Sequence, residues 1–565
     1  MRLTRLALLL SIATSMVSAP AGYGFANNTN SPNSLYQARI TINNDTESEN
    51  ESPSKSGLKR FALGLRLQHE DELRQLILDQ NDPKSRQFQK YLSVSQFVNR
   101  FSPSSKRYFG LVNYLTKNGF KIIRLTPNRL LIEAEGTEDQ IDKTLGLIDE
   151  LRMVDFPDET NQTQNKIPNY LSNSVQPIEL EKPSIAFPRH SNLTVIVDGK
   201  PEQYIDYSPS DIATAYNYPN SNNKLGSGKT LSGHGVTIAI AAGESYSLKD
   251  AQMFWNMFKI KRTGSIKNIY IGGRSHETSG ETTMDLEQVG AQAPGANVLM
   301  YISKDLSDLN FTLMFNKIIT DNAADVISHS YGLSEKVTDP EFINIMHQIL
   351  EEANAQGISI FNSTGDDGAY ILPPSLEMGP QYPSSDPYVI SVGGTTLTLN
   401  HNGLRNSEEA WKGTGGGISR IFAKPIWQVG PGVPNNIYRN TVDVALDADP
   451  KTGYYLVYKN VLRISGGTSF ATPNWAAGWV LAIEKIGHRI AMPNIYIYKI
   501  GNSKAYSDIF YNVTNGNNGL DIGPGYKAHK GFNHPTGWGA PNFGNLIDWL
   551  YNYINPAYKN IRAKP

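Results

Sequence analysis

The 565-residue sequence contains no cysteine. This absence excludes disulfide bonds, zinc sites with thiolate ligands, iron–sulfur clusters and a cysteine nucleophile. The chain also has no excess of charge of either sign, because 52 Lys and Arg residues balance 53 Asp and Glu residues. Nucleic-acid-binding proteins usually carry a basic excess or stripe, so we expect no nucleic-acid partner. No run of about 18 apolar residues occurs either, and we therefore expect no membrane-spanning segment and no membrane partner.

The N-terminus has the pattern of a secretory signal peptide. Arg2 and Arg5 precede an apolar stretch over residues 6–13, and small residues follow at 17–19. A positively charged start, a short apolar core and a small-residue cleavage site are typical of secretion. The sequence therefore predicts a signal peptide over residues 1–21 and a secreted protein, either extracellular or periplasmic.

The next part of the chain, residues 34–155, has the pattern of a small α+β unit. The periodicity predicts strands and helices in the order β-α-β-β-α, over residues 60–67, 70–79 with 106–118, 121–125, 130–135 and 138–151. This order is typical of a ferredoxin-like layer of helices on an antiparallel sheet. Residues 156–205 are rich in Pro, Asn and Ser with little periodicity, so we expect a linker that is accessible to cleavage.

The pattern changes over residues 206–555. Short apolar runs alternate with helical stretches such as 341–355, and these runs cover residues 236–242, 297–302, 325–330, 358–362 and 388–392. Continuous apolar strands that alternate with helices indicate an α/β fold, with a largely parallel sheet covered by helices on both faces. Active sites in such sheets usually lie beyond the carboxyl ends of the strands.

A candidate nucleophile lies in the stretch Gly-Gly-Thr-Ser at 466–469. The glycines allow a tight turn, Pro473 suits the first turn of a helix, and the apolar stretch 475–483 indicates that this helix is buried. Ser469 could therefore attack a substrate beside backbone amides that bind an oxyanion. The alternative is that Ser469 only caps the helix, because serine is a frequent N-cap residue.

The base for Ser469 is not an obvious histidine. None of the ten His residues lies in a recognisable serine-protease motif, and His234 and His329 fit structural or surface roles. Glu281 and Asp285 offer a carboxylate pair instead, since they lie four residues apart on a predicted helix and so share one face. Two adjacent carboxylates repel, one pKa rises, and the pair can share a proton. The alternative is an ordinary solvated acidic face.

A third candidate group, Asp366, lies in the stretch 363–368, which directly follows the predicted strand 358–362. At this position the carboxyl end of a strand meets the expected cleft, so the side chain could point at a reacting carbonyl. The alternative is an Asp-Gly turn without function, which is common.

The three segments, in the order Glu-x-x-x-Asp, Gly-Asp and Gly-Thr-Ser, together resemble the sedolisins, the serine-carboxyl peptidases. Supporting matches in the second half of the chain are residues 328–332, 388–395, Trp411 and 415–419. The N-terminal unit resembles the activation domain of the same family at residues 82–85, 91–93 and 101–103. The resemblance spans about residues 34–545.

This resemblance implies a subtilisin-like catalytic domain over 206–555, preceded by a propeptide over 34–155 that covers the cleft as an intramolecular inhibitor. It implies that Ser469 attacks the scissile carbonyl of protein or peptide substrates, forming an acyl-enzyme. Glu281 would accept the proton of Ser469, and Asp285 would orient Glu281. Asp366 would stand at the oxyanion position. The chain would thus be a zymogen that processes itself, with its maturation site in the linker 156–205.

The same assignment implies activity confined to acid. A carboxyl group with a pKa near about 4 still accepts a proton at a pH where a histidine base is already protonated. Asp366 can donate a hydrogen bond to an oxyanion only while it is protonated, so activity is expected to fall as the pH rises. Whether cleavage is internal or releases tripeptides is left open by the sequence.

The resemblance also implies a calcium site near the C-terminus, and the sequence departs from it there. The matching positions are Asn512 with Val513 and Gly531 with Asn533, where the family carries two carboxylates. Asp508 with Ile509 could serve as an alternative first pair. Calcium prefers carboxylate oxygens, so no cofactor is certain and calcium is in doubt. We expect the Asn side chains to close these loops by hydrogen bonds.

Two other functions fit parts of the pattern. A catalytically silent relative would keep the cleft and bind peptides without cutting them, although all four candidate catalytic residues are present. A different serine hydrolase, such as an esterase, would use the same nucleophile. The stretch Gly-Thr-Ser lacks the Gly-x-Ser-x-Gly elbow of those folds.

Overall fold

The computed structural model describes residues 57–145, 175–178, 187–188, 191–195, 206–226, 230–275, 278–371 and 377–562. By its internal contacts the chain divides into two units, Met1–Tyr36 and Gln37–Pro565. Every described residue belongs to the second unit, so the predicted signal peptide lies outside the described residues. Across the described ranges, no helix combines the length and apolar character that a membrane crossing needs.

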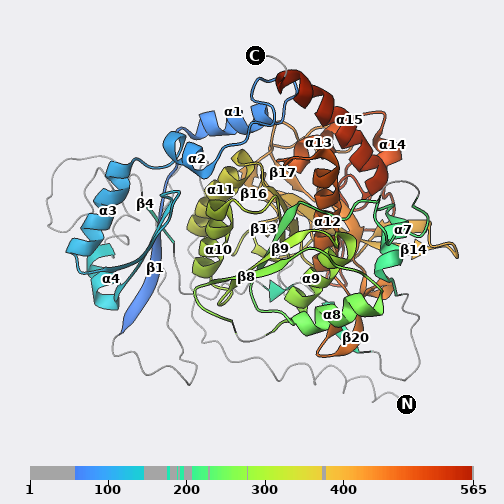
Figure 1. The fold of residues 1–565 in the computed structure, drawn as a ribbon, viewed down its shortest axis with the longest axis horizontal. Helices are drawn as coiled ribbons and strands as arrows, with labels where there is room; N and C mark the ends of the chain where they lie inside the picture. Colours follow the sequence, from blue (N-terminus) through green and yellow to red (C-terminus); the bar gives the residue numbers. More distant parts are fainter. Residues whose placement is uncertain are drawn as a thin grey trace. The chain divides into compact units, whose positions relative to one another are not determined.

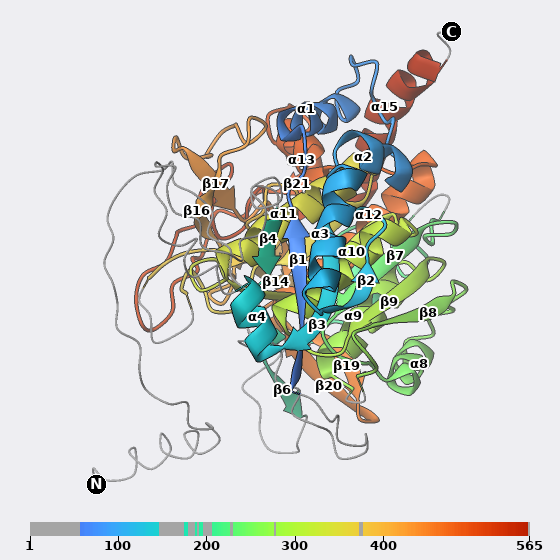
Figure 2. The ribbon, with the colours of Figure 1, turned by 90° about the vertical axis from the view of Figure 1, so that its left-hand side faces the viewer.

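Most of the first described range forms a small α+β domain, which we call the prodomain. Its elements are β1 (Leu58–Leu65), α1 (Glu70–Gln80), α2 (Val94–Arg100), α3 (Ser105–Lys117), β2 (Lys121–Leu125), β3 (Leu131–Thr137), α4 (Glu138–Leu145) and β4 (Val175–Ile178). All pairs in its sheet are antiparallel, in the order β2-β3-β1-β4. Figure 2 shows α3 and α4 beside this sheet. The ferredoxin-like arrangement that the sequence predicts is confirmed, including the helix α1 after β1, and α2 is an additional helix.

Three short strands come from the segment that the sequence analysis assigns to the linker. The first, β4, pairs with β1 and so belongs to the prodomain sheet. The other two, β5 (Phe187–Pro188) and β6 (Ser191–Val195), pair with β11 (Tyr331–Ser334) and β20 (Val461–Gly466) of the following domain. Described parts of this segment therefore pair with both domains.

The following domain, which we call the catalytic domain, is built on a mostly parallel sheet. Its central strands are β7 (Thr237–Ala242), β8 (Ile266–Ile271), β9 (Asn297–Ser303), β10 (Val326–His329), β12 (Ser359–Ser363), β14 (Ile390–Leu399), β15 (Arg405–Ala410) and β18 (Val444–Asp447). The order is β15-β14-β12-β10-β7-β9-β8, with β18 also beside β14, and only the β14–β15 pair is antiparallel. Each of the five apolar runs predicted as strands corresponds to one of these strands.

Helices cover both faces of this sheet, as Figure 1 shows. The main ones are α9 (Gly280–Gln292) and α12 (Thr468–Ile486) on one face, and α10 (Asp308–Asp321) and α11 (Pro340–Ala355) on the other. Alternate residues of β7 serve the two faces, since Ile238 and Ile240 belong to the core under α9 and α12 while Ala239 and Ala241 belong to the opposite core. Buried apolar residues on both sides explain why the strands are continuously apolar in sequence.

The remaining elements frame the sheet and its C-terminal edge. They are α7 (Pro209–Ala215), α8 (Leu248–Met257), β13 (Gln381–Tyr382), β16 (Gly417–Ala423), β17 (Tyr438–Thr441), β19 (Tyr454–Tyr458), α13 (Pro493–Gly501), α14 (Tyr506–Ile509), β21 (Phe510–Tyr511), β22 (Ala540–Pro541) and α15 (Phe543–Arg562).

The prodomain contacts the catalytic domain along helix α11. The Leu67 backbone N–H donates to Gln348 Oε1 at 2.6 Å, and Gln80 Nε2 donates to the Ala355 carbonyl at 3.1 Å. A third contact comes from the loop before β3, where Asn128 Nδ2 donates to Glu352 Oε2 at 2.7 Å. Side chains and the last backbone carbonyl of this one helix thus contact three separate segments of the prodomain.

Candidate active site

Ser469 lies in the first turn of the buried helix α12 and is itself fully buried. The helix begins at Thr468, and its N-cap is Gly467, which adopts φ 122° and makes no side-chain cap. Such a φ favours glycine, so the Gly-Gly turn predicted from the sequence is confirmed at this position. Ser469 is therefore not the N-cap, and that alternative is wrong. Pro473 lies inside the helix and not in its first turn, because the helix starts earlier than the sequence pattern suggested.

The structure links Ser469 to Asp285 through a third residue, Ser330. Ser330 directly follows β10, and its hydroxyl donates to Asp285 Oδ1 at 2.8 Å. The Ser469 hydroxyl in turn lies 3.4 Å from the Ser330 carbonyl oxygen. All three side chains are fully buried. The candidate nucleophile and one candidate carboxyl group thus belong to one site, at the carboxyl end of a central strand.

Glu281 and Asp285 lie one turn apart on α9, with exposures of 1% and 0%. The alternative of a solvated acidic face is therefore wrong. Burial, followed by the neighbouring Glu281 carboxylate, raises the pKa of Asp285 well above its ordinary value, and the Ser330 hydrogen bond only partly opposes this rise. Asp285 Oδ2 is also buried and has no hydrogen-bond partner among the described residues. This environment favours the protonated form of the Asp285 carboxyl group.

Asp366 lies in the loop after β12 and is bound to the residue before the candidate nucleophile. The Thr468 backbone N–H donates to Asp366 Oδ1 at 2.8 Å, and the Thr468 hydroxyl donates to the same oxygen at 2.9 Å. That hydroxyl also accepts from the Gly365 backbone N–H at 3.0 Å. The turn of Gly365 and Asp366 is thus fixed against the N-terminus of α12.

Sequence reasoning missed the roles of Ser330 and Thr468. Both lie inside segments that were matched to the family, but only the fold brings them into contact with the acidic side chains. Tyr331 was missed in the same way. Its hydroxyl lies 3.2 Å from Thr282 Oγ1, and its pKa is raised by burial and then by the nearby Glu281 carboxylate.

The two histidines considered from the sequence have structural or surface positions. His329 is buried, and its Nδ1 lies 2.9 Å from the Ala241 carbonyl oxygen, while burial lowers its pKa to about 4. His234 is exposed before β7. The His329 ring packs against the rings of Phe311 and Phe315.

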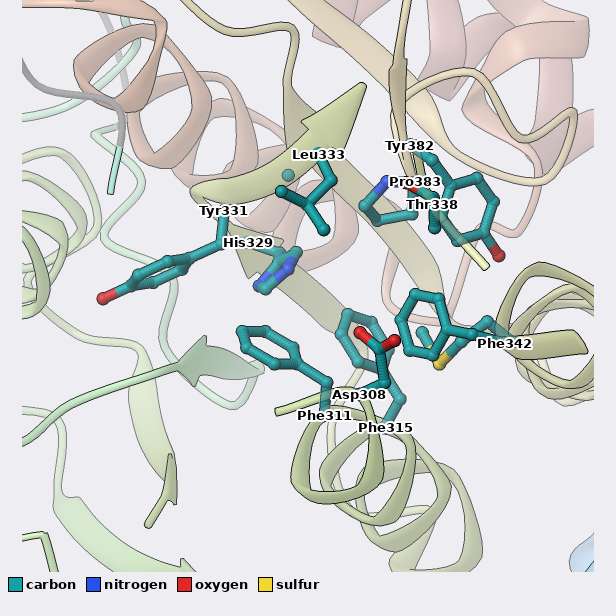
Figure 3. Close-up of a pocket in the computed structure, with 12 residues that line it drawn as sticks. Asp308, Phe311, Phe315, His329, Tyr331, Leu333, Thr338, Phe342, Tyr382 and Pro383 are labelled. Atoms are coloured by element: carbon teal, nitrogen blue, oxygen red, sulfur yellow. The ribbon is translucent and has the colours of Figure 1, made fainter. Parts of the chain in front are cut away.

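An aromatic pocket lies beside strand β11, which starts directly after Ser330. Figure 3 shows Phe311 and Phe315 of α10 and Phe342 of α11 pointing into it, with Tyr382 and Pro383 at the opposite side. β11 itself pairs with β13 on one edge and with β5 on the other. Both edges of β11 are thus occupied, and β5 shows how an extended segment can lie along this strand.

The positions matched to a calcium site lie together in the structure, in two loops after β21 and before β22. Asn512 and Val513 belong to the first loop, and Gly531 and Asn533 belong to the second. Within the described ranges, no three or more His, Asp or Glu side chains gather in a way that could hold a metal ion. The side chains that meet here are amides, whose donors are considered below.

Comparisons with known proteins match both domains of this chain. Residues 45–180 match the family described as pro-kumamolisin activation domain, and residues 158–539 match the subtilase family. Sedolisin from Pseudomonas sp. (strain 101) is 28% identical over 87% of this chain and 86% of its own length. Tripeptidyl-peptidase 1 from Homo sapiens is 24% identical over 87% of this chain and 91% of its own.

A solved structure is similar to the catalytic domain as well. The structure of the Pseudomonas serine-carboxyl proteinase sedolisin, complexed with two molecules of pseudo-iodotyrostatin, superposes with a TM-score of 0.56 at 27% identity. The match covers 62% of this chain and 99% of that one. The subtilisin-like fold predicted from the sequence is confirmed.

Proposed function

This chain belongs to the subtilase family and is a serine-type peptidase of the sedolisin kind, and from that premise we propose that it is a secreted, acid-active endopeptidase made as a self-processing zymogen. The observation that carries the proposal is the buried path from Ser469 through Ser330 to Asp285, with Glu281 one turn away. A purely peptide-binding relative would gain nothing from burying two adjacent carboxyl groups beside a serine, because burial of such a pair is costly.

In the proposed mechanism, the Ser469 hydroxyl attacks the scissile carbonyl and its proton passes to Glu281. The carbonyl oxygen becomes an oxyanion, and a protonated Asp366 donates to it. Collapse of this intermediate breaks the C–N bond, and Glu281 returns the proton to the leaving amine. Water then attacks the acyl-enzyme by the same route and frees Ser469.

Asp285 and Thr468 would act as positioning residues in this scheme. Asp285, held by Ser330, supplies a neighbour whose protonation state sets the proton affinity of Glu281. Thr468 binds Asp366 Oδ1 with two donors, so the proton given to the oxyanion would sit on Oδ2. As the pH rises, Asp366 would ionise and repel the oxyanion, and activity would be lost.

Self-processing is supported by the two short strands β5 and β6, which lie in sequence on either side of residues 189 and 190. Pro188 pairs with Tyr331, the residue after Ser330, in an antiparallel register. Ser191 pairs with Gly466, three residues before Ser469. The chain thus pairs with one strand on each side of the nucleophile, as an extended substrate does. We therefore place the first cut between Pro188 and Ser191.

The test is acidification of the full chain. Expressed at neutral pH and shifted to about pH 4, the wild type is expected to release its prodomain, with a new N-terminus between residues 189 and 191. Ser469→Ala is expected to stay intact, which mass spectrometry of the products would show. A Ser469→Ala chain that still processes itself in the absence of wild-type enzyme, or a pH–rate profile that peaks above neutrality, would contradict the proposal.

Digestion of a peptide library by the matured enzyme separates the remaining possibilities. Cuts inside long peptides indicate an endopeptidase, whereas stepwise loss of three residues from free N-termini indicates tripeptidyl release, as the name of the human relative describes. Hydrolysis of short-chain esters without cleavage of casein at acid pH would favour the esterase alternative.

A further inference from the structure

Two loops near the C-terminus are joined by a pair of asparagine side chains. The first loop follows β21 and carries Asn512 and Val513, and the second precedes β22 and carries Gly531 and Asn533. Asn512 Nδ2 donates to the Gly531 carbonyl at 3.0 Å, and the Gly531 backbone N–H donates to Asn512 Oδ1 at 3.0 Å. Each loop reaches the backbone of the other, and we call Asn512 and Asn533 the amide clasp.

Asn533 is the more deeply placed half of the clasp, with an exposure of 1%. Its Nδ2 donates to the carbonyl oxygens of Val513 and His529, both at 3.1 Å. Its Oδ1 accepts from the backbone N–H of Thr536 at 3.1 Å and from the Thr536 hydroxyl at 2.9 Å. An asparagine amide offers two N–H donors and two lone pairs, so all four of its hydrogen bonds are made.

These contacts fix which end of each amide faces the carbonyl oxygens. In both residues the oxygen accepts from a backbone N–H, and the nitrogen must therefore point at the carbonyl groups. The carbonyl oxygens of Val513, Gly531 and His529 thus already receive donors. A calcium ion needs such oxygens as ligands and adds carboxylates that balance its charge. The side chains of Asn512 and Asn533 bring no negative charge to this point, and their N–H donors face the carbonyl oxygens that a cation would bind.

The alternative carboxylate, Asp508, does not repair the site. Its side chain is exposed on α14. The carbonyl oxygens of Asp508 and Ile509 accept from Asn545 Nδ2 at 2.6 Å and from the Asn542 backbone N–H at 2.7 Å. The residues of this chain therefore do not fit the calcium site that the resemblance implies.

We propose that the amide clasp replaces a calcium ion in this protein, because its N–H groups bind the carbonyl oxygens that the ion would bind. The catalytic domain therefore folds and keeps its stability without calcium. The N–H donors of Asn512 and Asn533 occupy the positions from which a positive charge would attract the same carbonyl oxygens. Asparagine and aspartate have the same shape, but a carboxylate has no donor. Replacing both amides by carboxylates would therefore turn this point into a cluster of oxygens that needs a cation.

The test measures thermal unfolding, and not activity, on the full-length chain with Ser469→Ala, which prevents processing. At pH 6.5, the melting temperature is expected to differ by less than about 1 °C between 5 mM EDTA and 5 mM CaCl₂, because a ligand that does not bind the folded state cannot stabilise it. The double variant Asn512→Asp/Asn533→Asp is expected to melt lower in EDTA and to regain about 5 °C or more in calcium.

A charge-matched control is Asn515→Asp/Asn517→Asp, in the same stretch of chain but outside the clasp. It is expected to show no calcium response. A calcium-dependent rise in the melting temperature of the chain with native Asn512 and Asn533, or calcium bound to it at one equivalent in equilibrium dialysis, would overturn the proposal. So would a folded double variant that calcium does not stabilise. If the double variant does not fold, calcium dialysis and thermal unfolding of the chain with native Asn512 and Asn533 still test the proposal.

Discussion

Two helices of the catalytic domain each bury a pair of carboxyl groups, and the pairs differ in what surrounds them. On α9, Asp285 is linked to Ser469 through Ser330, with Glu281 one turn away, and the hydrogen bond to Asp285 comes from a neutral hydroxyl. On α11, Glu351 and Glu352 are just as buried, with exposures of 0%. The α11 pair lies under the prodomain and receives donors from it.

The donors of the α11 pair come from several elements. Glu351 Oε1 lies 3.4 Å from Arg74 Nε of the prodomain, 3.8 Å from His347 Nε2 and 3.0 Å from the Tyr388 hydroxyl, which donates to it. Burial opposes the charge on His347, but Asp386, 2.8 Å away, and Glu351 outweigh it and raise its pKa to about 9. Burial still raises the pKa of Glu351, although His347, Arg74 and the Tyr388 hydroxyl oppose this rise, so the charge of Glu351 is only partly compensated.

The comparison teaches that burial of adjacent carboxyl groups does not by itself identify a catalytic pair. What separates α9 from α11 is the neighbour. The α9 pair receives a donor from the Ser330 hydroxyl, which lies next to the candidate nucleophile, whereas the α11 pair receives donors from cations, a tyrosine hydroxyl and amides. We expect substitutions on α9 to change the chemistry and substitutions on α11 to change the docking of the prodomain.

The largest expected effect is on α9. Glu281→Gln and Asp285→Asn are each expected to slow the acid-triggered maturation of the zymogen by about 10²–10⁴-fold. The first removes the proton acceptor, and the second removes the neighbour that sets the proton affinity of Glu281. The matched substitution Glu351→Gln keeps the size of the side chain and should leave maturation within about threefold of wild type. Gel electrophoresis of samples taken after a shift to about pH 4 measures the rates. Equal losses of maturation rate in the α9 and α11 variants would show that the two carboxyl pairs do not differ in function.

A smaller effect is expected where the prodomain meets Glu352. Asn128 is fully buried, and its Nδ2 donates to Glu352 Oε2 at 2.7 Å and to Asn316 Oδ1 at 2.6 Å. Asn128→Leu removes this donor and should lower the free energy of unfolding by about 1–3 kcal/mol. Urea denaturation of the Ser469→Ala zymogen measures the loss.

Asn118 provides the control, because its side chain is exposed and donates only within its own helix end. Asn118→Leu should stay within about 0.5 kcal/mol of wild type. An equal loss in both variants would mean that the Asn128 contact does not hold the two domains together.

Glu352 also makes the stability of the zymogen depend on pH. Burial raises its pKa to about 8, although Asn128 and Gln356 donate to its charged form. The folded state therefore holds this proton more tightly than the unfolded state does, and the contribution to stability is full below about pH 4.5 and lost as the pH rises towards 8. Glu352→Gln imitates the protonated form and should flatten the fall in zymogen stability between pH 5 and 8, by up to about 1 kcal/mol per pH unit. Denaturation series at several pH values measure both slopes.

The raised pKa of Glu352 also bears on how the zymogen is activated in acid. Acid protonates Glu352 and so favours the docked prodomain at this point, which means that release in acid must come from other groups. The prodomain offers one candidate, since Glu133 is buried in β3 and pairs with Arg60 and Arg124. If the Glu352→Gln zymogen no longer matured in acid, the release would depend on Glu352 itself and not on other groups.

The sequence was sufficient to predict those elements whose local residue pattern directly reflects their burial or their helical spacing. The strands of the catalytic sheet are continuously apolar because both faces are covered, and the four-residue spacing of Glu281 and Asp285 requires only a helix. Ser330 and Thr468 could not be found in this way, because they meet Asp285 and Asp366 across 45 and 102 residues of chain. The strands β4, β5 and β6 were missed for a related reason, since their partners and not their own periodicity define them.

The smallest effect is expected at the edge of the α11 pair. Arg74 is 45% exposed in its side chain and also contacts Glu70 and Asp71 at 2.9 and 3.0 Å, so its attraction to Glu351 is shared and screened by water. Arg74→Ala should cost the zymogen about 1 kcal/mol or less. The difference from wild type should shrink between 0.05 and 0.5 M salt, whereas the loss in Asn128→Leu should persist, because a buried amide contact is not screened. Urea denaturation at the two salt concentrations tests both. An Arg74 effect that exceeds the Asn128 effect would show that ion pairs, and not buried amides, hold the prodomain on α11.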